Sequence, residues 1–127
     1  MSKQVISTHN APSAVGPYSQ AVVANGIVYT AGQLGLVPAT GNMVEGDVAA
    51  QTHQVLNNLK AVLEAAGSNL DQVIKTTVFL QNMDDFAAMN GVYSQYFSAP
   101  YPARSTVEVA KLPKNGLVEI EVVALVK

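Results

Sequence analysis

Hydrophobic positions in the middle of the chain follow a helical repeat. Between Asp47 and Ala66, apolar residues recur at steps of three and four, with polar residues between them. This spacing places the apolar side chains on one face of a helix. They are Val48, Val55, Leu56, Leu59, Val62, Leu63 and Ala66. Asp47 suits the N-cap and Gly67 the left-handed position after the last turn, so the sequence predicts a helix between them.

Several other apolar runs are typical of strands because they are rich in β-branched residues. Gln20–Ala24 and Ile27–Ala31 flank Asn25-Gly26, the residue pair that best suits the tight turn of a β-hairpin. Beyond the helix, the same reasoning predicts three more strands. These cover Ile74–Leu80, Arg104–Val109 and Leu117–Val126.

A second helix is predicted to open at Asn82 or Asp84 and to end before Pro100. Its apolar stripe is Phe86, Met89, Tyr93, Tyr96 and Phe97. Asn90 lies inside this stripe, where an apolar residue would be routine. Because a buried amide needs hydrogen-bond partners, Asn90 either orients a ligand or loop or ties the helix to the sheet.

The order of the elements predicts an α+β fold with a mixed β-sheet. Right-handed crossovers would put both helices on one face of that sheet. The last strand is apolar on one side, and the other side is interrupted only by Glu119 and Glu121. A strand with two apolar faces favours burial on both, and no third helix is available to cover the second face. We therefore expect a second copy of the chain to cover it.

Composition supports self-association. The 127 residues, 13.3 kDa, predict one domain spanning residues 1–127. Charged residues make up 13% of the chain, against an average of about 25%, and hydrophobic residues make up 49%. A small monomer of this kind would expose a large apolar surface, which neighbouring copies can bury. The alternative is a monomer that is simply rich in alanine and valine.

Several classes of protein are disfavoured. The absence of cysteine excludes disulfides, thiolate catalysis and cysteine-ligated metals, and His9 and His53 lack metal-ligand spacing. The first residues lack the apolar core of a secretory leader, and no apolar run approaches membrane-spanning length, so we expect a cytoplasmic protein without membrane partners. A net charge of −2 and seven scattered Lys and Arg residues disfavour nucleic acid as a partner.

Two side chains are candidates for chemistry. Arg104 is the only arginine, and it shares a strand face with Thr106 and Glu108. A guanidinium can bind a carboxylate through two hydrogen bonds, so Arg104 can anchor a small organic acid or take part in a structural ion pair. Glu119, in semi-apolar surroundings, can retain enough proton affinity to act as a general base toward water. For Glu121 a structural role is preferred.

Taken in order, four groups of segments resemble one family. They are Gly16-Pro17-Tyr18-Ser19-Gln20; Ala31-Gly32-Gln33; Phe86-Ala87-Ala88-Met89-Asn90; and Pro102-Ala103-Arg104-Ser105 with Leu112-Pro113-Lys114 and Val118-Glu119-Ile120-Glu121. Together they span nearly the whole chain. The sequence is similar to the RidA (YjgF) family of reactive-intermediate imine deaminases.

The resemblance implies a chorismate-mutase-like fold and a homotrimer whose sheets pack inward, with ligand clefts between subunits. It also implies cofactor-independent hydrolysis of 2-imino acids, tautomers of enamines such as 2-aminoacrylate and 2-aminocrotonate, to 2-oxo acids and ammonia. Arg104 falls on the family's carboxylate-binding arginine and Glu119 on its water-activating glutamate. Tyr18, Gly32 and Asn90 fall on cleft-lining positions.

One position departs from the family pattern. Many members carry a cysteine two residues after the arginine, where this chain has Thr106. Thr106 is expected to line the substrate site, but thiol-dependent behaviour is not expected. Two alternatives to the enzyme stay open at this point. One is a non-catalytic trimer that binds metabolites or regulates a partner, and the other is a ribonuclease or translation inhibitor.

Overall fold

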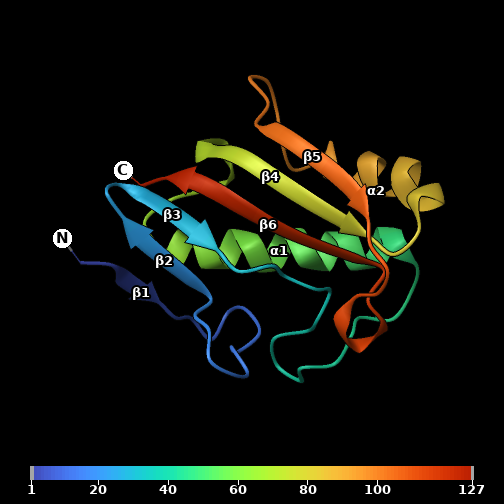
Figure 1. Cartoon of the computed structure of the whole chain (residues 1–127), viewed down its shortest axis with the longest axis horizontal. Helices are drawn as coiled ribbons and strands as arrows, with labels where there is room; N and C mark the ends of the chain where they lie inside the picture. Colours follow the sequence, from blue (N-terminus) through green and yellow to red (C-terminus); the bar gives the residue numbers. More distant parts are fainter. Residues whose placement is uncertain (1, 127) are drawn as a thin grey trace.

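The computed structural model describes residues 2–126 and contains one six-stranded sheet covered by helices (Figure 1). The spatial order of the strands is β1-β2-β3-β6-β4-β5. All neighbouring strands are antiparallel except the parallel pair β4 and β5. The strands are β1 (Gln4–Ile6), β2 (Ala21–Ala24), β3 (Ile27–Thr30), β4 (Val73–Leu80), β5 (Ala103–Glu108) and β6 (Val118–Leu125). The predicted mixed α+β architecture is confirmed.

The long helix α1 (Val48–Ala65) forms where the helical repeat predicts it. The Asp47 carboxylate accepts a hydrogen bond of 3.1 Å from the Ala50 amide and so caps the first turn. Gly67 follows the helix with φ 80°, in the left-handed region that favours glycine. Five residues of the apolar stripe are fully buried against the sheet: Val55, Leu56, Leu59, Val62 and Leu63. Their burial fixes α1 across the sheet.

The predicted hairpin is also confirmed. Asn25 and Gly26 have φ angles of 53° and 75°. They form the turn between Ala24 and Ile27, the last paired residues of β2 and β3. The first strand, β1, was not predicted from the sequence. It pairs with β2 through three residues, and the polar and apolar positions around it are too few to give a periodic signal.

The second helix is shorter than predicted. A 3-10 turn, η2 (Met83–Asp85), precedes it, and the Asn82 side chain caps that turn by accepting a 2.9 Å bond from the Asp84 amide. Helix α2 (Phe86–Tyr93) then ends, so Tyr96 and Phe97 lie beyond its last turn. They still pack inward, and Tyr96 brings its hydroxyl within 2.9 Å of His53 Nδ1 on α1.

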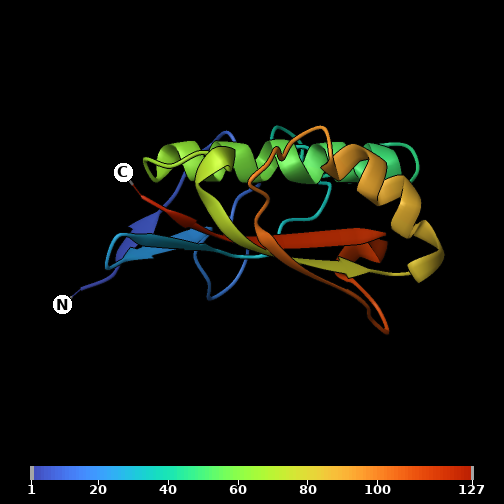
Figure 2. The same cartoon turned by 90° about the horizontal axis from the view of Figure 1, so that it is seen from above.

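The two faces of the sheet differ. Both helices cover one face, as predicted (Figure 2). On β6, alternate residues point to this helical face and are buried: Val118, Ile120, Val122 and Ala124. The intervening residues, among them Glu119 and Glu121, face the opposite side, called here the open face. Tyr29 and Leu125 on the open face are 49% and 43% exposed.

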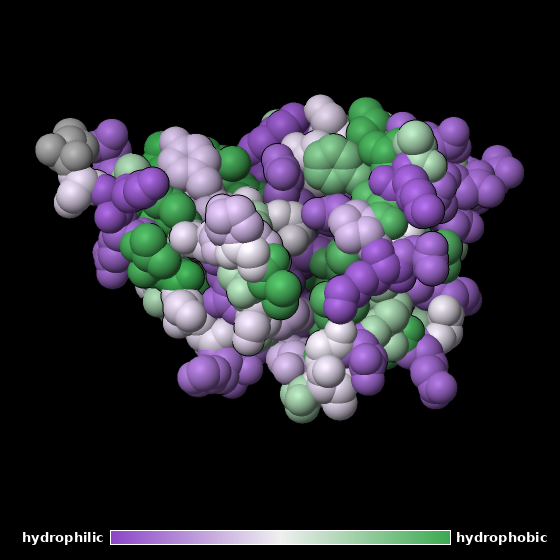
Figure 3. All heavy atoms as spheres, turned by 60° about the horizontal axis from the view of Figure 1, so that its bottom comes forward, coloured by the Kyte–Doolittle hydropathy of each residue, from purple (hydrophilic) through white to green (hydrophobic). Residues whose placement is uncertain are grey.

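Loops and short turns complete the chain. The turns η1 (Leu70–Gln72) and η3 (Pro113–Asn115) precede β4 and β6. On the side that carries many of the loops, hydrophobic side chains reach the surface in separate groups among hydrophilic ones (Figure 3). None of the helices in residues 2–126 combines the length and apolar character needed to cross a bilayer.

Candidate functional site

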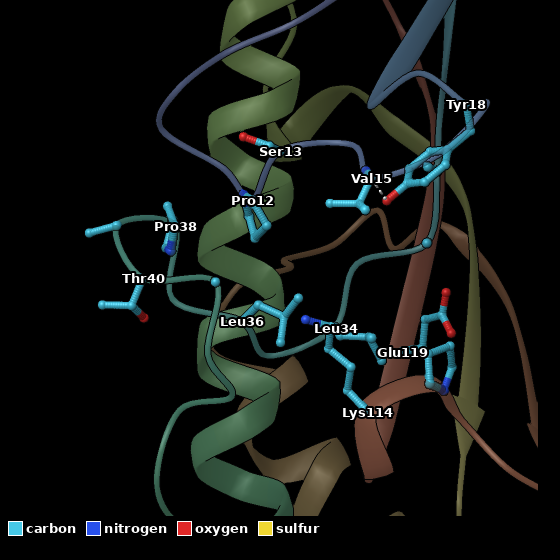
Figure 4. Close-up of a pocket in the computed structure, with 15 residues that line it drawn as sticks. Pro12, Ser13, Val15, Tyr18, Leu34, Leu36, Pro38, Thr40, Lys114 and Glu119 are labelled. Carbon is cyan, nitrogen blue, oxygen red and sulfur yellow. Dashed lines mark hydrogen bonds between the residues drawn. The ribbon is translucent and has the colours of Figure 1, made fainter.

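A hollow of about 790 Å³ lies where several loops meet the start of β6. We call it the carboxylate pocket because Glu119 lines it (Figure 4). Its other lining residues are Pro12, Ser13, Val15, Tyr18, Ala31, Gly32, Leu34, Leu36, Pro38, Ala39, Thr40, Gly41, Pro113 and Lys114. Most of these side chains are small or apolar, so Glu119 and Lys114 supply the charges of the lining.

Glu119 is the second residue of β6, and its strand neighbours Val118 and Ile120 are buried under the helices. Its carboxylate therefore points to the open face and into the carboxylate pocket. Burial raises the pKa of Glu119 above the ordinary value, and the negative charge of nearby Glu121 raises it further. A carboxylate with raised proton affinity is a stronger base toward water.

Gly32 lines the pocket directly beside this carboxylate. A Cβ atom at Gly32 would overlap Oε2 of Glu119 and would lie 2.9 Å from its Cδ, so any side chain here would displace the carboxylate. The next residue, Gln33, fixes the approach through two backbone hydrogen bonds with Ile120, of 2.9 and 3.1 Å. The glycine is needed because the loop and β6 lie so close together.

Tyr18 comes from the turn before β2 and is 54% exposed. Its hydroxyl accepts a hydrogen bond of 3.4 Å from the Val15 amide, and this bond holds the tyrosine side chain against the segment that precedes it. Figure 4 shows Tyr18 and Glu119 along one side of the pocket, with Leu36 and Pro38 toward the other. Three predicted site residues, Tyr18, Gly32 and Glu119, are thus brought together.

Arg104 lies in a second, smaller hollow of about 460 Å³, called here the arginine pocket. Its lining residues are Asn90, Tyr93, Ser94, Tyr101, Pro102 and Arg104. Arg104 Nη1 donates a 2.7 Å hydrogen bond to Oδ1 of Asn90. The guanidinium carbon also lies 5.4 Å from the ring centre of Phe86 and 4.7 Å from that of Tyr93. Helix α2 therefore supplies all three of these partners.

The partners of Arg104 are uncharged. A guanidinium has five N–H donors in a planar fork, and Asn90 uses one of them, so several remain for a ligand. Burial raises the pKa of Tyr93, which keeps its hydroxyl protonated and bonded at 2.9 Å to Thr76. Because no negative charge compensates Arg104 at these contacts, the pocket favours an anion such as a carboxylate.

Thr106 lies two residues after Arg104 on the same face of β5. Its Oγ1 is buried and has no hydrogen-bond partner within residues 2–126. A buried hydroxyl group normally pairs with protein, water or a ligand, so this atom is available to a small polar molecule.

The two pockets share no lining residue. Arg104 pairs with Thr76, which is fully buried under α2, so Arg104 points to the helical face. Glu119 pairs with Phe79 on the open face. A single chain thus brings together Arg104 and Asn90, and separately Tyr18, Gly32 and Glu119, but it does not place the two groups in one pocket.

Sequence reasoning assigned no site role to several lining residues. Leu34, Leu36 and Lys114 line the carboxylate pocket, and Tyr93 lines the arginine pocket. Tyr93 could have been found, because it lies one helical turn after Asn90 and therefore shares its face. Lys114 has a positive φ of 55° in η3, which no periodic pattern indicates. Within residues 2–126, no group of three or more acidic or histidine side chains is placed to hold a metal.

Comparisons with known proteins place the chain in a family. The family model described as Endoribonuclease L-PSP matches residues 8–126. A RutC family protein of Pyrococcus horikoshii is 55% identical over 96% of this chain and 97% of its own. A Capra hircus protein named 2-iminobutanoate/2-iminopropanoate deaminase is 48% identical over 97% of this chain and 90% of its own.

A solved structure gives the same result for the fold. TdcF of E. coli, crystallised with bound serine, superposes with a TM-score of 0.92, 43% identity and coverage of 98% of this chain and 99% of that one. The family model matches most of the chain, and the relatives match at high identity over nearly their whole lengths. The chain therefore belongs to the Endoribonuclease L-PSP family, also known as the RidA (YjgF) family.

Proposed function

We propose that this protein is a cofactor-independent deaminase that hydrolyses 2-imino acids to 2-oxo acids and ammonia. The substrates would be the imine tautomers of enamines such as 2-aminoacrylate and 2-aminocrotonate. The observation that carries the proposal is the Glu119 carboxylate. It lies half-buried beside Gly32, with its pKa raised and with no hydrogen-bond partner in residues 2–126. Relatives at 48% identity that are named imine deaminases support the same assignment.

In the proposed reaction, Glu119 takes a proton from a water molecule as that water attacks the imine carbon. The new C–O bond replaces the C=N π bond, and the nitrogen becomes an amine. The proton held by Glu119 passes to the nitrogen and completes this amine. The new hydroxyl group then gives its proton through Glu119 to the amine nitrogen, so that the C–N bond breaks, ammonia leaves and the C–O bond becomes the C=O bond of the 2-oxo acid. The imine carbon is already electrophilic, so positioning and one general base are sufficient.

Arg104 is proposed to hold the substrate carboxylate through its remaining N–H donors, with Asn90 fixing the guanidinium. Thr106 would offer its unpaired hydroxyl to the same end of the substrate. Tyr18 and Gly32 would shape the reacting end. TdcF was solved with serine, an amino acid whose carboxylate resembles that of a 2-imino acid.

We propose that Glu119 and Arg104 meet in clefts between the subunits of a homotrimer. The separation of the two pockets within one chain supports this arrangement, because one chain alone brings no cation from the arginine pocket to Glu119. The open face also carries exposed apolar residues, including Tyr29, Val107 and Leu125. Packing the sheets inward would bury them.

The family description names an endoribonuclease, which is the less favoured of the two alternatives to the deaminase. RNA binding usually relies on a basic patch, whereas this chain has a net charge of −2. His53, a potential acid or base, is already engaged with Tyr96 across the α1–α2 contact. A trimer that only binds or senses the same small acids would use the same pockets without turnover, so the assay must measure product.

The test measures 2-oxo acid release from freshly generated 2-aminoacrylate and 2-aminocrotonate, with and without the protein. It is extended by mixing two inactive variants, Glu119→Gln and Arg104→Lys, after dissociation and reassembly. If each cleft takes Glu119 from one chain and Arg104 from its neighbour, about a quarter of clefts in an equal mixture regain both residues. Activity that stays at the level of the separate variants would contradict the shared cleft. No acceleration by the unaltered protein would contradict the deaminase.

A further inference from the structure

The wall of the carboxylate pocket that contains Leu34 and Leu36 belongs to the connection between β3 and α1. Both side chains line the pocket (Figure 4). This connection is not part of a regular strand or helix, although Leu36 forms an isolated bridge with Met43. The distance between this wall and Glu119 is therefore set by contacts of the wall with α1.

Asn58 on α1 makes the main polar contact with this wall. Its side-chain nitrogen donates to the backbone oxygen of Leu34 at 3.2 Å and to that of Leu36 at 2.9 Å. Its side-chain oxygen accepts a 2.9 Å bond from Gln54. Asn58 is 1% exposed, among the apolar residues of the helix stripe. A side-chain amide at such a site is costly unless it is fully paired, and here both donors are used on the wall.

A second contact presses the same segment against the helix. A Cβ atom on Gly35, between the two leucines, would lie 3.1 Å from Cα and Cβ of Gln51. The side-chain oxygen of Gln51 in turn accepts a 2.8 Å bond from the Leu117 amide, two residues before Glu119. Helix α1 thus holds both the leucine wall and the start of the strand that carries the carboxylate.

We propose that Asn58 is a positioning residue that sets the distance between the leucine wall and Glu119 and so determines which substrate side chains the pocket prefers. This inference rests on the proposed deaminase function. Arg104 would hold the carboxylate and Glu119 would face the imine carbon, so the leucine wall is the surface left for a short aliphatic side chain. A fixed wall gives a contact that a four-carbon substrate makes fully and a three-carbon substrate makes only in part.

The test compares kcat/KM for the four-carbon 2-iminobutanoate and the three-carbon 2-iminopropanoate. Asn58→Leu keeps a similar volume but removes both donors to the wall. Because one methylene group in a well-formed pocket is worth about tenfold or more in kcat/KM, the four-carbon to three-carbon ratio should fall by about five- to tenfold. A general loss of stability would lower both rates together and leave the ratio unchanged.

Ser68→Ala is the matched control. Ser68 is also buried and donates a 2.6 Å bond to a backbone oxygen, that of Leu125 at the far end of β6 from Glu119. It should lower the melting temperature without changing the ratio. An unchanged ratio in folded Asn58→Leu overturns the proposal. If that variant does not fold, Asn58→Ala decides in the same way, since it also removes both donors to the wall and alanine favours the helix.

Failure of the proposed function has a different signature. If the unaltered protein releases no 2-oxo acid, the same variants are compared by calorimetric binding of the four-carbon and three-carbon 2-oxo acids. A change in relative affinity in Asn58→Leu, absent in Ser68→Ala, supports the positioning role without turnover. Equal relative affinities in all three proteins overturn it.

Discussion

The carboxylate pocket and the arginine pocket surround their charged residues with opposite environments. Glu119 lies among apolar side chains with no hydrogen-bond partner in residues 2–126, and its pKa is raised. Arg104 is held by a hydrogen bond and two aromatic rings, all uncharged. An unpartnered carboxylate gains basicity, whereas a guanidinium fixed by neutral groups keeps its full charge for an incoming anion. One pocket is suited to proton transfer and the other to anchoring.

The largest expected effect separates the two carboxylates of β6. Glu119→Gln keeps the shape of the side chain but cannot accept a proton from water, so kcat should fall by about 10²–10⁴, the usual contribution of a general base. Binding of a 2-oxo acid should be largely retained. Steady-state kinetics and calorimetry measure the two quantities. Full activity in Glu119→Gln would contradict the proposed mechanism, as would abolition of turnover by Glu121→Gln in an intact oligomer.

The next prediction concerns the neutrality of the arginine pocket. Asn90→Asp can still accept the hydrogen bond from Arg104, but it adds a negative charge 2.7 Å from the guanidinium nitrogen in the present geometry. This charge competes with the substrate carboxylate, so KM should rise by about tenfold or more, with a smaller change in kcat. Asn90→Ala is the control, because it removes the bond without adding charge. Equal KM increases in both variants would show that Asn90 only orients the guanidinium.

The two pockets also differ in how far the sequence could predict them. Periodicity predicts α1 because its stripe runs for five turns, and Asn25-Gly26 predicts the hairpin because few residues tolerate two positive φ angles. The same reasoning places Asn90 inside the apolar stripe of the second helix. It misses β1, whose three residues are too short for a pattern, and it extends α2 to Phe97, because Tyr96 and Phe97 stay apolar in the following turn.

The separation of Glu119 from Arg104 depends on the register of the strands, which could not be predicted from the sequence. Alternation places Arg104 and Thr106 on one face of β5 and places Glu119 and Glu121 on one face of β6. Which of these faces meets the helices follows only from the pairing of Arg104 with Thr76 and of Glu119 with Phe79. The loop wall at Leu34 depends likewise on buried contacts with α1 that no local pattern reveals.

A smaller effect is expected from the charge that Glu121 adds to the carboxylate pocket. Glu121 raises the pKa of Glu119, although burial is the larger cause. Glu121→Gln should therefore lower the pKa of Glu119. The base works when deprotonated, so activity should persist to lower pH, and the acid limb of the kcat/KM profile should move in that direction. An acid limb that stays in place or moves to higher pH would show that Glu121 does not influence the base.

The smallest effect is expected at Thr106, the position where many family members carry cysteine. In this chain Thr106 Oγ1 is buried beside the arginine pocket without a partner in residues 2–126, and the proposed mechanism gives it no proton to transfer. The thiol of Thr106→Cys is of similar size and can still offer a weak hydrogen bond to the substrate, so kcat/KM should change by less than about threefold. Thr106→Val, which removes the hydroxyl and keeps the shape, is the matched control. A large gain in rate for cysteine but not for valine would mean that a thiol takes part in the reaction. That result would favour the alternative hypothesis that this chain mainly binds its ligand over the hypothesis that it is an efficient deaminase.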